Sequence, residues 1–186
     1  DFFETSRMIW TNCRTLPMNS AAMEAKIRTL YEADQAERTV GWEQIDWETL
    51  RANDAHRLAQ AKQIYRLFTD IDVELSGEAL YQLGLLFQHS PAVEDLLLAR
   101  RCGELSGTKG YTDGDWLAAA AEDRYLLATT GVQKWGTQFY KTEAGAWEQR
   151  PMLSDAESGV TDEQRAAKGV PPRSRQLAVF RARTDI

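Results

Sequence analysis

The chain of 186 residues is long enough to form one domain with a sizeable hydrophobic core. Hydrophobic residues make up 43% of the sequence and charged residues 27%, proportions typical of soluble globular proteins. The formal net charge of −6 and the lack of a basic stripe argue against nucleic-acid binding. No apolar run approaches the roughly 20 residues that a membrane helix needs. Composition leaves the compartment, exported or cytoplasmic, open.

Apolar residues recur mostly at helical spacing, which predicts a mostly α-helical fold: an antiparallel bundle of helical hairpins with TPR-like packing. We expect an N-terminal segment over residues 1–19 that packs on a single helical domain over 20–186. Helices are predicted over about 21–38, 48–68, 77–89, 91–105, 116–130, 161–169 and 174–183. Gly131 is expected to end the fifth helix and Asp113 or Asp115 to cap its start. One small β-hairpin is predicted near residues 137–150.

Three carboxylates interrupt the apolar faces of these helices: Asp34, Asp54 and Asp123. A bare charge is costly to bury, so each must be paired, hydrogen-bonded or close to a solvated cleft. If they converge with His89 and Arg124, the imidazole and a carboxylate suit acid–base chemistry, and the guanidinium suits an anionic group. A plainer interpretation is a buried polar network that fixes the helix packing, in which Asp54 or Asp123 caps or bridges helices with Arg124 as its partner.

Other chemical motifs are absent from the sequence. Cys13 and Cys102 lack metal-ligand spacing, and both a disulfide and two buried thiols remain open for them. There is no HExxH, no phosphate-binding glycine loop and no GxSxG. We therefore predict neither a metal site nor a cofactor.

Several short motifs occur in a characteristic order: Gln88-His89, then Asp123-Arg124-Tyr125, then Gly136-Thr137-Gln138-Phe139. In this order they resemble an uncharacterised bacterial family of helical domains, and the resemblance covers about residues 27–180. It implies that the polar residues of these motifs belong to one site, but it supplies no reaction. The chain departs from the family after His89, because Pro91 and Ala92 stand where a glycine or an acidic residue is common.

Two classes of function fit this pattern. The first is a module that binds an unidentified small molecule or protein. Its expected ligand-binding residues are Asp34, Gln35, Asp54, Gln88, Arg124, Thr137 and Gln138. The alternative is a hydrolase with His89 as general base and Asp123 or Asp54 as its partner carboxylate, Asp123 being the preferred acid–base partner. A structural subunit of a larger assembly is a third hypothesis.

Overall fold

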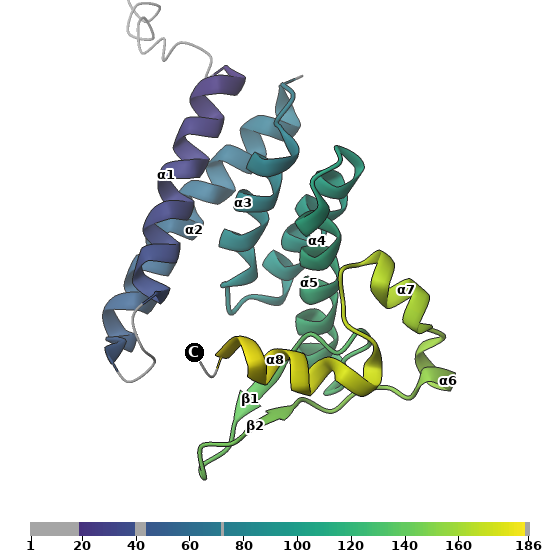
Figure 1. The fold of residues 1–186 in the computed structure, drawn as a ribbon. Coiled ribbons are helices and arrows are strands. Elements are labelled where there is room, and N and C mark those ends of the chain that lie inside the picture. The colour runs from purple at the N-terminus through teal and green to yellow at the C-terminus, as the bar shows by residue number, and fades with distance from the viewer. Residues whose placement is uncertain (1–18, 40–43, 72, 185–186) are drawn as a thin grey trace, which may run out of the picture.

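The computed structural model describes residues 19–39, 44–71 and 73–184. Five long helices form the body of the protein (Figure 1). They are α1 (Ser20–Arg38), α2 (Trp47–Asp70), α3 (Gly77–Gln88), α4 (Val93–Thr108) and α5 (Thr112–Thr130). The expected docking of residues 1–19 and the state of Cys13 lie outside the described residues, apart from Asn19, whose side chain caps α1.

Helix α3 is the centre of this body. Every residue from 82 to 88 is buried, as expected for a helix that is apolar nearly all round. The helix contacts α1, α2, α4 and α5. Leu80, Leu83 and Phe87 are fully buried in the main hydrophobic core, to which Met23 of α1 also belongs. The predicted mostly α-helical single domain with one small hairpin is confirmed.

Helix α5 differs from its predicted form at its start. It begins at Thr112, earlier than the predicted start at 116, and Tyr111 precedes it without a side-chain cap. Asp113 and Asp115 lie in the first turn, where negative charge is favourable near the helix N-terminus, but neither is the cap residue. The predicted end is confirmed, because Gly131 adopts a left-handed φ of 81° after the last turn.

A smaller C-terminal part packs below the helical body (Figure 1). It contains β1 (Phe139–Lys141), β2 (Trp147–Gln149), α6 (Asp155–Ser158), α7 (Asp162–Ala167), the 3₁₀ turn η2 (Arg173–Arg175) and α8 (Gln176–Thr184). The strands pair antiparallel, with Phe139 opposite Gln149. Phe139 stacks on Phe180 of α8 with ring centroids 4.0 Å apart, so the hairpin and the last helix share an aromatic contact.

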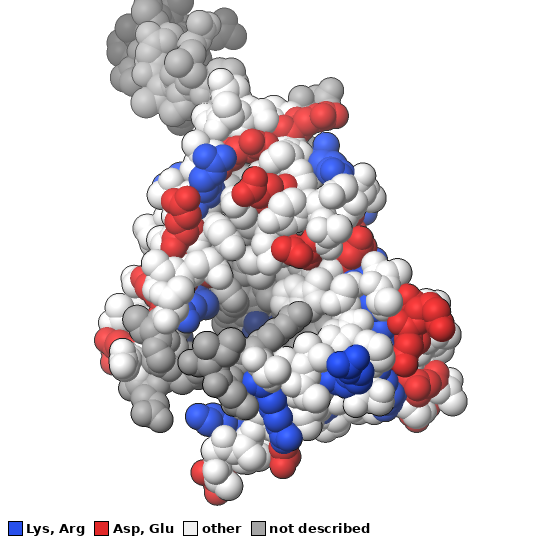
Figure 2. Space-filling view, viewed as in Figure 1, with Lys and Arg blue, Asp and Glu red and all other residues white. Residues whose placement is uncertain are grey.

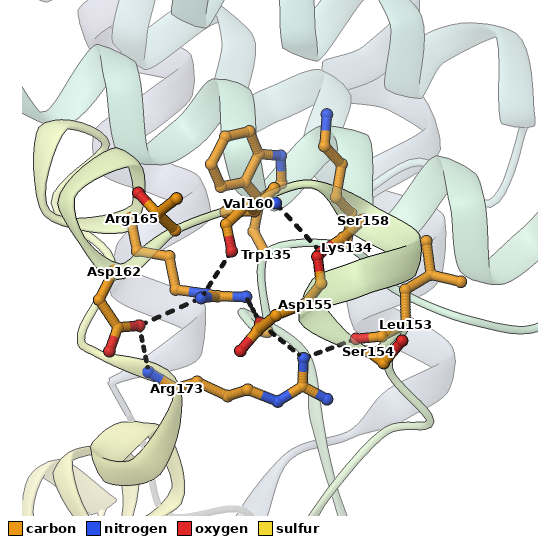
Figure 3. Close-up of polar contacts among 12 residues, drawn as sticks. Lys134, Trp135, Leu153, Ser154, Asp155, Ser158, Val160, Asp162, Arg165 and Arg173 are labelled. Carbon is orange, nitrogen blue, oxygen red and sulfur yellow. Dashed lines mark hydrogen bonds and ion pairs between the residues drawn. The ribbon is translucent and has the colours of Figure 1, made fainter.

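An ion-pair cluster joins the segments around α6 and α7 (Figure 3). Arg165 is fully buried, and its guanidinium contacts Asp155 at 2.8 Å and Asp162 at 3.1 Å. Arg173 adds a second cation to Asp155 at 3.0 Å and donates to the carbonyl of Leu153. Helix α6, which periodicity did not predict, begins with a capping box of Ser154 and Glu157.

No helix in the described ranges is both long enough and apolar enough to cross a lipid bilayer.

Candidate functional site

Asp123 of α5 is a structural anchor for the loop that follows the helix. Its side chain is fully buried and accepts backbone N–H bonds from Lys134 and Trp135 on one oxygen, at 2.7 and 2.8 Å. The other oxygen accepts from the N–H groups of Gly136 and Thr137 and from the Thr137 hydroxyl. Burial raises the pKa of Asp123 above its ordinary value, and these hydrogen bonds offset that rise only in part. Its described hydrogen bonds all go to this loop and none to His89.

The loop itself is fixed by glycine geometry and by two buried glutamines. Gly136 has a φ of +92°, and a Cβ there would lie 2.0 Å from Oε1 of Gln176. Gln133 is fully buried; its amide donates to the carbonyl of Gln138 at 3.0 Å and accepts from the Gln138 N–H at 2.9 Å. The backbone path that presents Thr137 and Gln138 is therefore set by buried polar contacts.

His89 is the residue that caps the C-terminus of α3. Its Nδ1 is 3.0 Å from a carboxylate oxygen of Asp34 on α1. Asp34 is only 1% exposed, whereas the His89 side chain is 21% exposed. Burial by itself would raise the pKa of Asp34, but the hydrogen bond and charge of His89, with the charge of Arg38, hold that pKa below its ordinary value. The carboxylate that orients His89 is thus Asp34, and not Asp123 or Asp54 as expected.

A network of ion pairs surrounds Asp34. Arg38 contacts Asp34 at 2.6 Å and Asp54 at 2.8 Å, and so joins α1 to α2. Arg57 contacts Asp54 at 2.7 Å and Glu37 at 2.6 Å. The aspartates of both helices are therefore neutralised by arginines on the same two helices.

Arg124 is partly buried and is different from these arginines. Its Nη1 donates to the carbonyl oxygen of Gln88 at the end of α3, and no carboxylate in the described ranges lies within ion-pair distance of it. Burial lowers the pKa of Arg124, and the nearby charge of Arg38 lowers it further. The predicted pairing of Arg124 with Asp54 or Asp123 is not formed.

Two other buried arginines have the carboxylate partners that Arg124 lacks among the described residues. Arg57 and Arg165 are 7% and 1% exposed at the side chain, and each contacts two carboxylates within 3.2 Å. Arg124 has only the partial negative charge of a helix C-terminus beside it. A desolvated guanidinium without an anion is energetically unfavourable, and binding an anion would relieve that cost.

Three cavities share both His89 and Arg124 in their walls. The Leu58 cavity, of about 390 Å³, is lined also by Arg51, Asp54, Leu58, Leu86 and Pro91. The Trp47 cavity, of about 500 Å³, is lined also by Arg38, Ile45, Trp47, Leu50, Arg51 and Asp54. The Phe139 cavity, of about 380 Å³, is lined also by Gln88, Trp116, Thr137, Gln138, Phe139 and Phe180. In Figure 2, basic side chains lie beside and below the hollow near the middle of the visible face, and acidic ones gather mainly toward its upper half and right edge.

The predicted site residues are thus divided among these cavities. Asp54 and Arg124 line the first two, and Gln88, Thr137 and Gln138 join Arg124 in the third. Asp34 and Gln35 line none of the three. Gln35 instead donates to Asp34 at 2.8 Å and so supports the carboxylate behind His89.

Sequence reasoning missed four charged residues: Glu37, Arg38 and Arg57, which complete the network, and Arg51. Spacing could have found two of them, because Arg38 is four residues after Asp34 and Arg57 three after Asp54, positions that face each other on a helix. Arg51 lines two of the cavities, and no carboxylate of the described ranges is within ion-pair distance of it.

The hydroxyl and thiol groups near the cavities are already engaged or inaccessible. Ser90 donates to the buried Asp95 at 2.6 Å, and Asp95 also contacts Lys62 at 2.8 Å. Thr137 donates to Asp123. Cys102 is a free, fully buried thiol whose pKa burial raises to about 12. Among the residues that the structure describes, no group of three or more His, Cys, Asp and Glu side chains could hold a metal ion.

No protein-family model matches the chain, and neither a curated protein nor a solved structure matches it. The resemblance of its motifs to a bacterial helical family therefore stays a prediction, and the functional argument rests on geometry.

Proposed function

We propose that this protein is a binding module for a small organic anion, whose carboxylate is held by Arg124 where the three cavities meet. The observation that carries the proposal is the lack of any carboxylate partner for this partly buried guanidinium within the described residues. Guanidinium presents five N–H donors in a planar fork that matches a carboxylate, and one of its groups is already oriented by the Gln88 carbonyl.

The walls around Arg124 favour an anion with an apolar body. Leu58, Leu86 and Pro91 line one side, and Trp116 and Phe139 line another. Cavities of about 380 to 500 Å³ fall in the size range of small-molecule sites, which combine apolar walls with a few polar groups. Thr137 and Gln138 supply such polar groups at the edge of the Phe139 cavity.

Isothermal titration calorimetry with benzoate, glutarate, suberate and inorganic phosphate, at constant ionic strength, tests the proposal. We expect at least one of the carboxylates to bind the wild-type protein. Arg124→Met should weaken that binding by about 30-fold or more, because truncating one member of a desolvated charge pair costs about 2–5 kcal/mol. Arg124→Lys should lose less, since the charge is kept but the fork is not.

Arg101→Met is the matched control, because Arg101 is an exposed arginine of α4 that lines none of the three cavities. It should bind the same anion as tightly as the wild type. If no carboxylate binds the wild-type protein, or if folded Arg124→Met binds it equally well, Arg124 is not an anion site.

A further inference from the structure

The cavity junction holds a second feature that simple binding does not require: an imidazole with one nitrogen fixed and the other free. Nδ1 of His89 contacts the buried carboxylate of Asp34, while Nε2 makes no hydrogen bond with any residue in the described ranges. A carboxylate at Nδ1 fixes the proton there, so the neutral ring presents an unprotonated Nε2. Because the ring lines all three cavities together with Arg124, this basic nitrogen is available beside the proposed anion.

We propose that the protein hydrolyses small carboxylic esters that carry a second, free carboxylate, with His89 as general base; this rests on the anion site at Arg124. Arg124 holds the free carboxylate, and the ester carbonyl lies against the His89 ring. The rest of the acyl chain contacts the apolar wall formed by Leu58, Leu86 and Pro91.

Water is the nucleophile in this proposal, because the protein's own candidates are engaged. The Ser90 hydroxyl donates to Asp95, and the Thr137 hydroxyl donates to Asp123. Both carboxylates are buried and would lose a hydrogen bond if the hydroxyl turned toward a substrate. The Cys102 thiol is fully buried in the core, out of reach of a substrate.

The reaction then needs one proton acceptor and no further reactant. Nε2 of His89 takes a proton from water as the water oxygen bonds to the carbonyl carbon, and the carbonyl electron pair moves onto oxygen. When that pair returns, the bond to the alcohol oxygen breaks and the imidazolium gives its proton to the leaving alkoxide. The products are the carboxylic acid and the alcohol. Asp34 acts as a positioning residue that holds the ring and stabilises its charged form.

The test uses two chromogenic esters: the p-nitrophenyl monoester of suberic acid, which keeps a free carboxylate, and p-nitrophenyl butyrate, which has none. Release of p-nitrophenolate is followed after subtraction of the rate without protein. The wild type should prefer the anionic ester in kcat/KM by at least about 10-fold, and Arg124→Met should remove that preference. His89→Gln should lower kcat by about 10²–10⁴-fold, the usual contribution of a general base.

His56→Gln is the matched control, because His56 is an exposed histidine of α2 and the chain has only these two. It should leave turnover unchanged. Asp34→Asn should lower kcat by about 10-fold or more while the dissociation constant of suberate changes little, a split that simple loss of structure would not produce. Circular dichroism and thermal unfolding establish that each variant is folded.

Two results would overturn the proposal. One is a wild-type protein that binds suberate through Arg124 but never exceeds the uncatalysed rate of either ester; the anion site then stands and the catalysis fails. The other is turnover that survives His89→Gln. If neither benzoate, glutarate nor suberate binds and no turnover is seen, the anion site itself is removed.

Discussion

Asp34 and Asp123 are both almost wholly buried, and their carboxylates are satisfied in opposite ways. Asp123 accepts four backbone N–H groups and one hydroxyl, all from residues 134–137. Asp34 accepts from side chains only: Gln35, Arg38 and His89. Their pKa values accordingly shift in opposite directions, upward for Asp123 and downward for Asp34.

This difference gives Asp123 a structural role and makes Asp34 the candidate for a role in chemistry. Backbone amides cannot change protonation state or leave without unfolding the loop, so Asp123 fixes the position of Thr137 and Gln138. The partners of Asp34 are side chains, and two of them, Arg38 and His89, line a cavity. A carboxylate of this kind can orient and charge a neighbour at the edge of a cavity, which is why the proposed chemistry belongs to Asp34 and His89.

The largest expected effect follows from breaking the Asp123 anchor. Asp123→Asn replaces one acceptor oxygen by an NH₂ group that faces buried N–H donors, so those donors lose their partners. We expect a loss of about 3–5 kcal/mol in the free energy of unfolding, measured by urea denaturation. Asp70→Asn, at the exposed end of α2, is the control and should change it by less than about 0.5 kcal/mol. A small effect of Asp123→Asn would mean that the loop does not depend on this carboxylate.

The next largest effect is expected at Gly136, in the loop that Asp123 holds. Gly136→Ala puts a Cβ 2.0 Å from Oε1 of Gln176 at a φ of +92°, so it combines steric overlap with left-handed strain. We expect a loss of about 2–4 kcal/mol in unfolding free energy. Gly110→Ala separates the two causes, because Gly110 has a φ of +82° with nothing within 4 Å of a new Cβ. It should lose only about 1–2 kcal/mol; equal losses would show that the contact with Gln176 is not tight.

Periodicity and turn residues were sufficient to predict most of the fold, because long helices depend on local spacing. The predicted range 21–38 is close to α1, and the range 77–89 to α3. The start of α5 was predicted too late because Tyr111 supplies no side-chain cap that a sequence pattern could show. Helix α6 is a single turn held by a capping box, too short to give a periodic signal.

The site was less predictable, because its pairings depend on how separate helices are placed. Of the three carboxylates on interrupted apolar faces, Asp34 and Asp123 are buried, whereas Asp54 is only partly buried. Which carboxylate meets His89 depends on α1 lying against the end of α3, a contact 55 residues apart in sequence. Likewise, α5 and the following loop turn Asp123 toward backbone amides, so that its neighbour Arg124 receives no carboxylate in the described ranges.

A smaller effect, and one that depends on pH, is expected for the Asp34 network. Asp34→Asn keeps an acceptor oxygen for His89, and Arg38 keeps its ion pair with Asp54. We therefore expect a loss of about 1–2 kcal/mol in the free energy of unfolding near neutral pH. Because the folded-state pKa of Asp34 is lowered, its stabilising contribution is complete above the unfolded value of about 4 and is lost as the pH falls through the folded value. The difference between wild type and Asp34→Asn should therefore narrow below about pH 4.

Asp123→Asn should show the opposite pH dependence when its unfolding free energy is compared with that of the wild type. In the wild type the folded-state pKa of Asp123 is raised, so the folded protein binds a proton at Asp123 more readily than the unfolded chain does. Protonation of Asp123 therefore adds to the free energy of unfolding as the pH falls toward about 4. The difference between wild type and Asp123→Asn should widen there. If the stability differences of Asp34→Asn and Asp123→Asn from the wild type changed in the same direction with pH, the two aspartates would not have the opposite roles argued above.

Arg124→Met is expected to change stability least, although it should weaken anion binding most. Arg124→Met keeps the apolar part of the side chain and removes a charge that burial and Arg38 both disfavour, as the lowered pKa of Arg124 indicates. Its one described hydrogen bond, to the Gln88 carbonyl, is lost in exchange. These effects oppose each other, so the unfolding free energy should change by less than about 1 kcal/mol in either direction. Arg57→Met is the comparison, because it removes the cationic partner that the structure describes for Glu37 and leaves Asp54 with Arg38. It should lose about 3 kcal/mol or more in unfolding free energy. If Arg124→Met destabilised the protein as much as Arg57→Met does, Arg124 would be a structural arginine with the same role as Arg57, and the argument that its charge is kept for a ligand would fail.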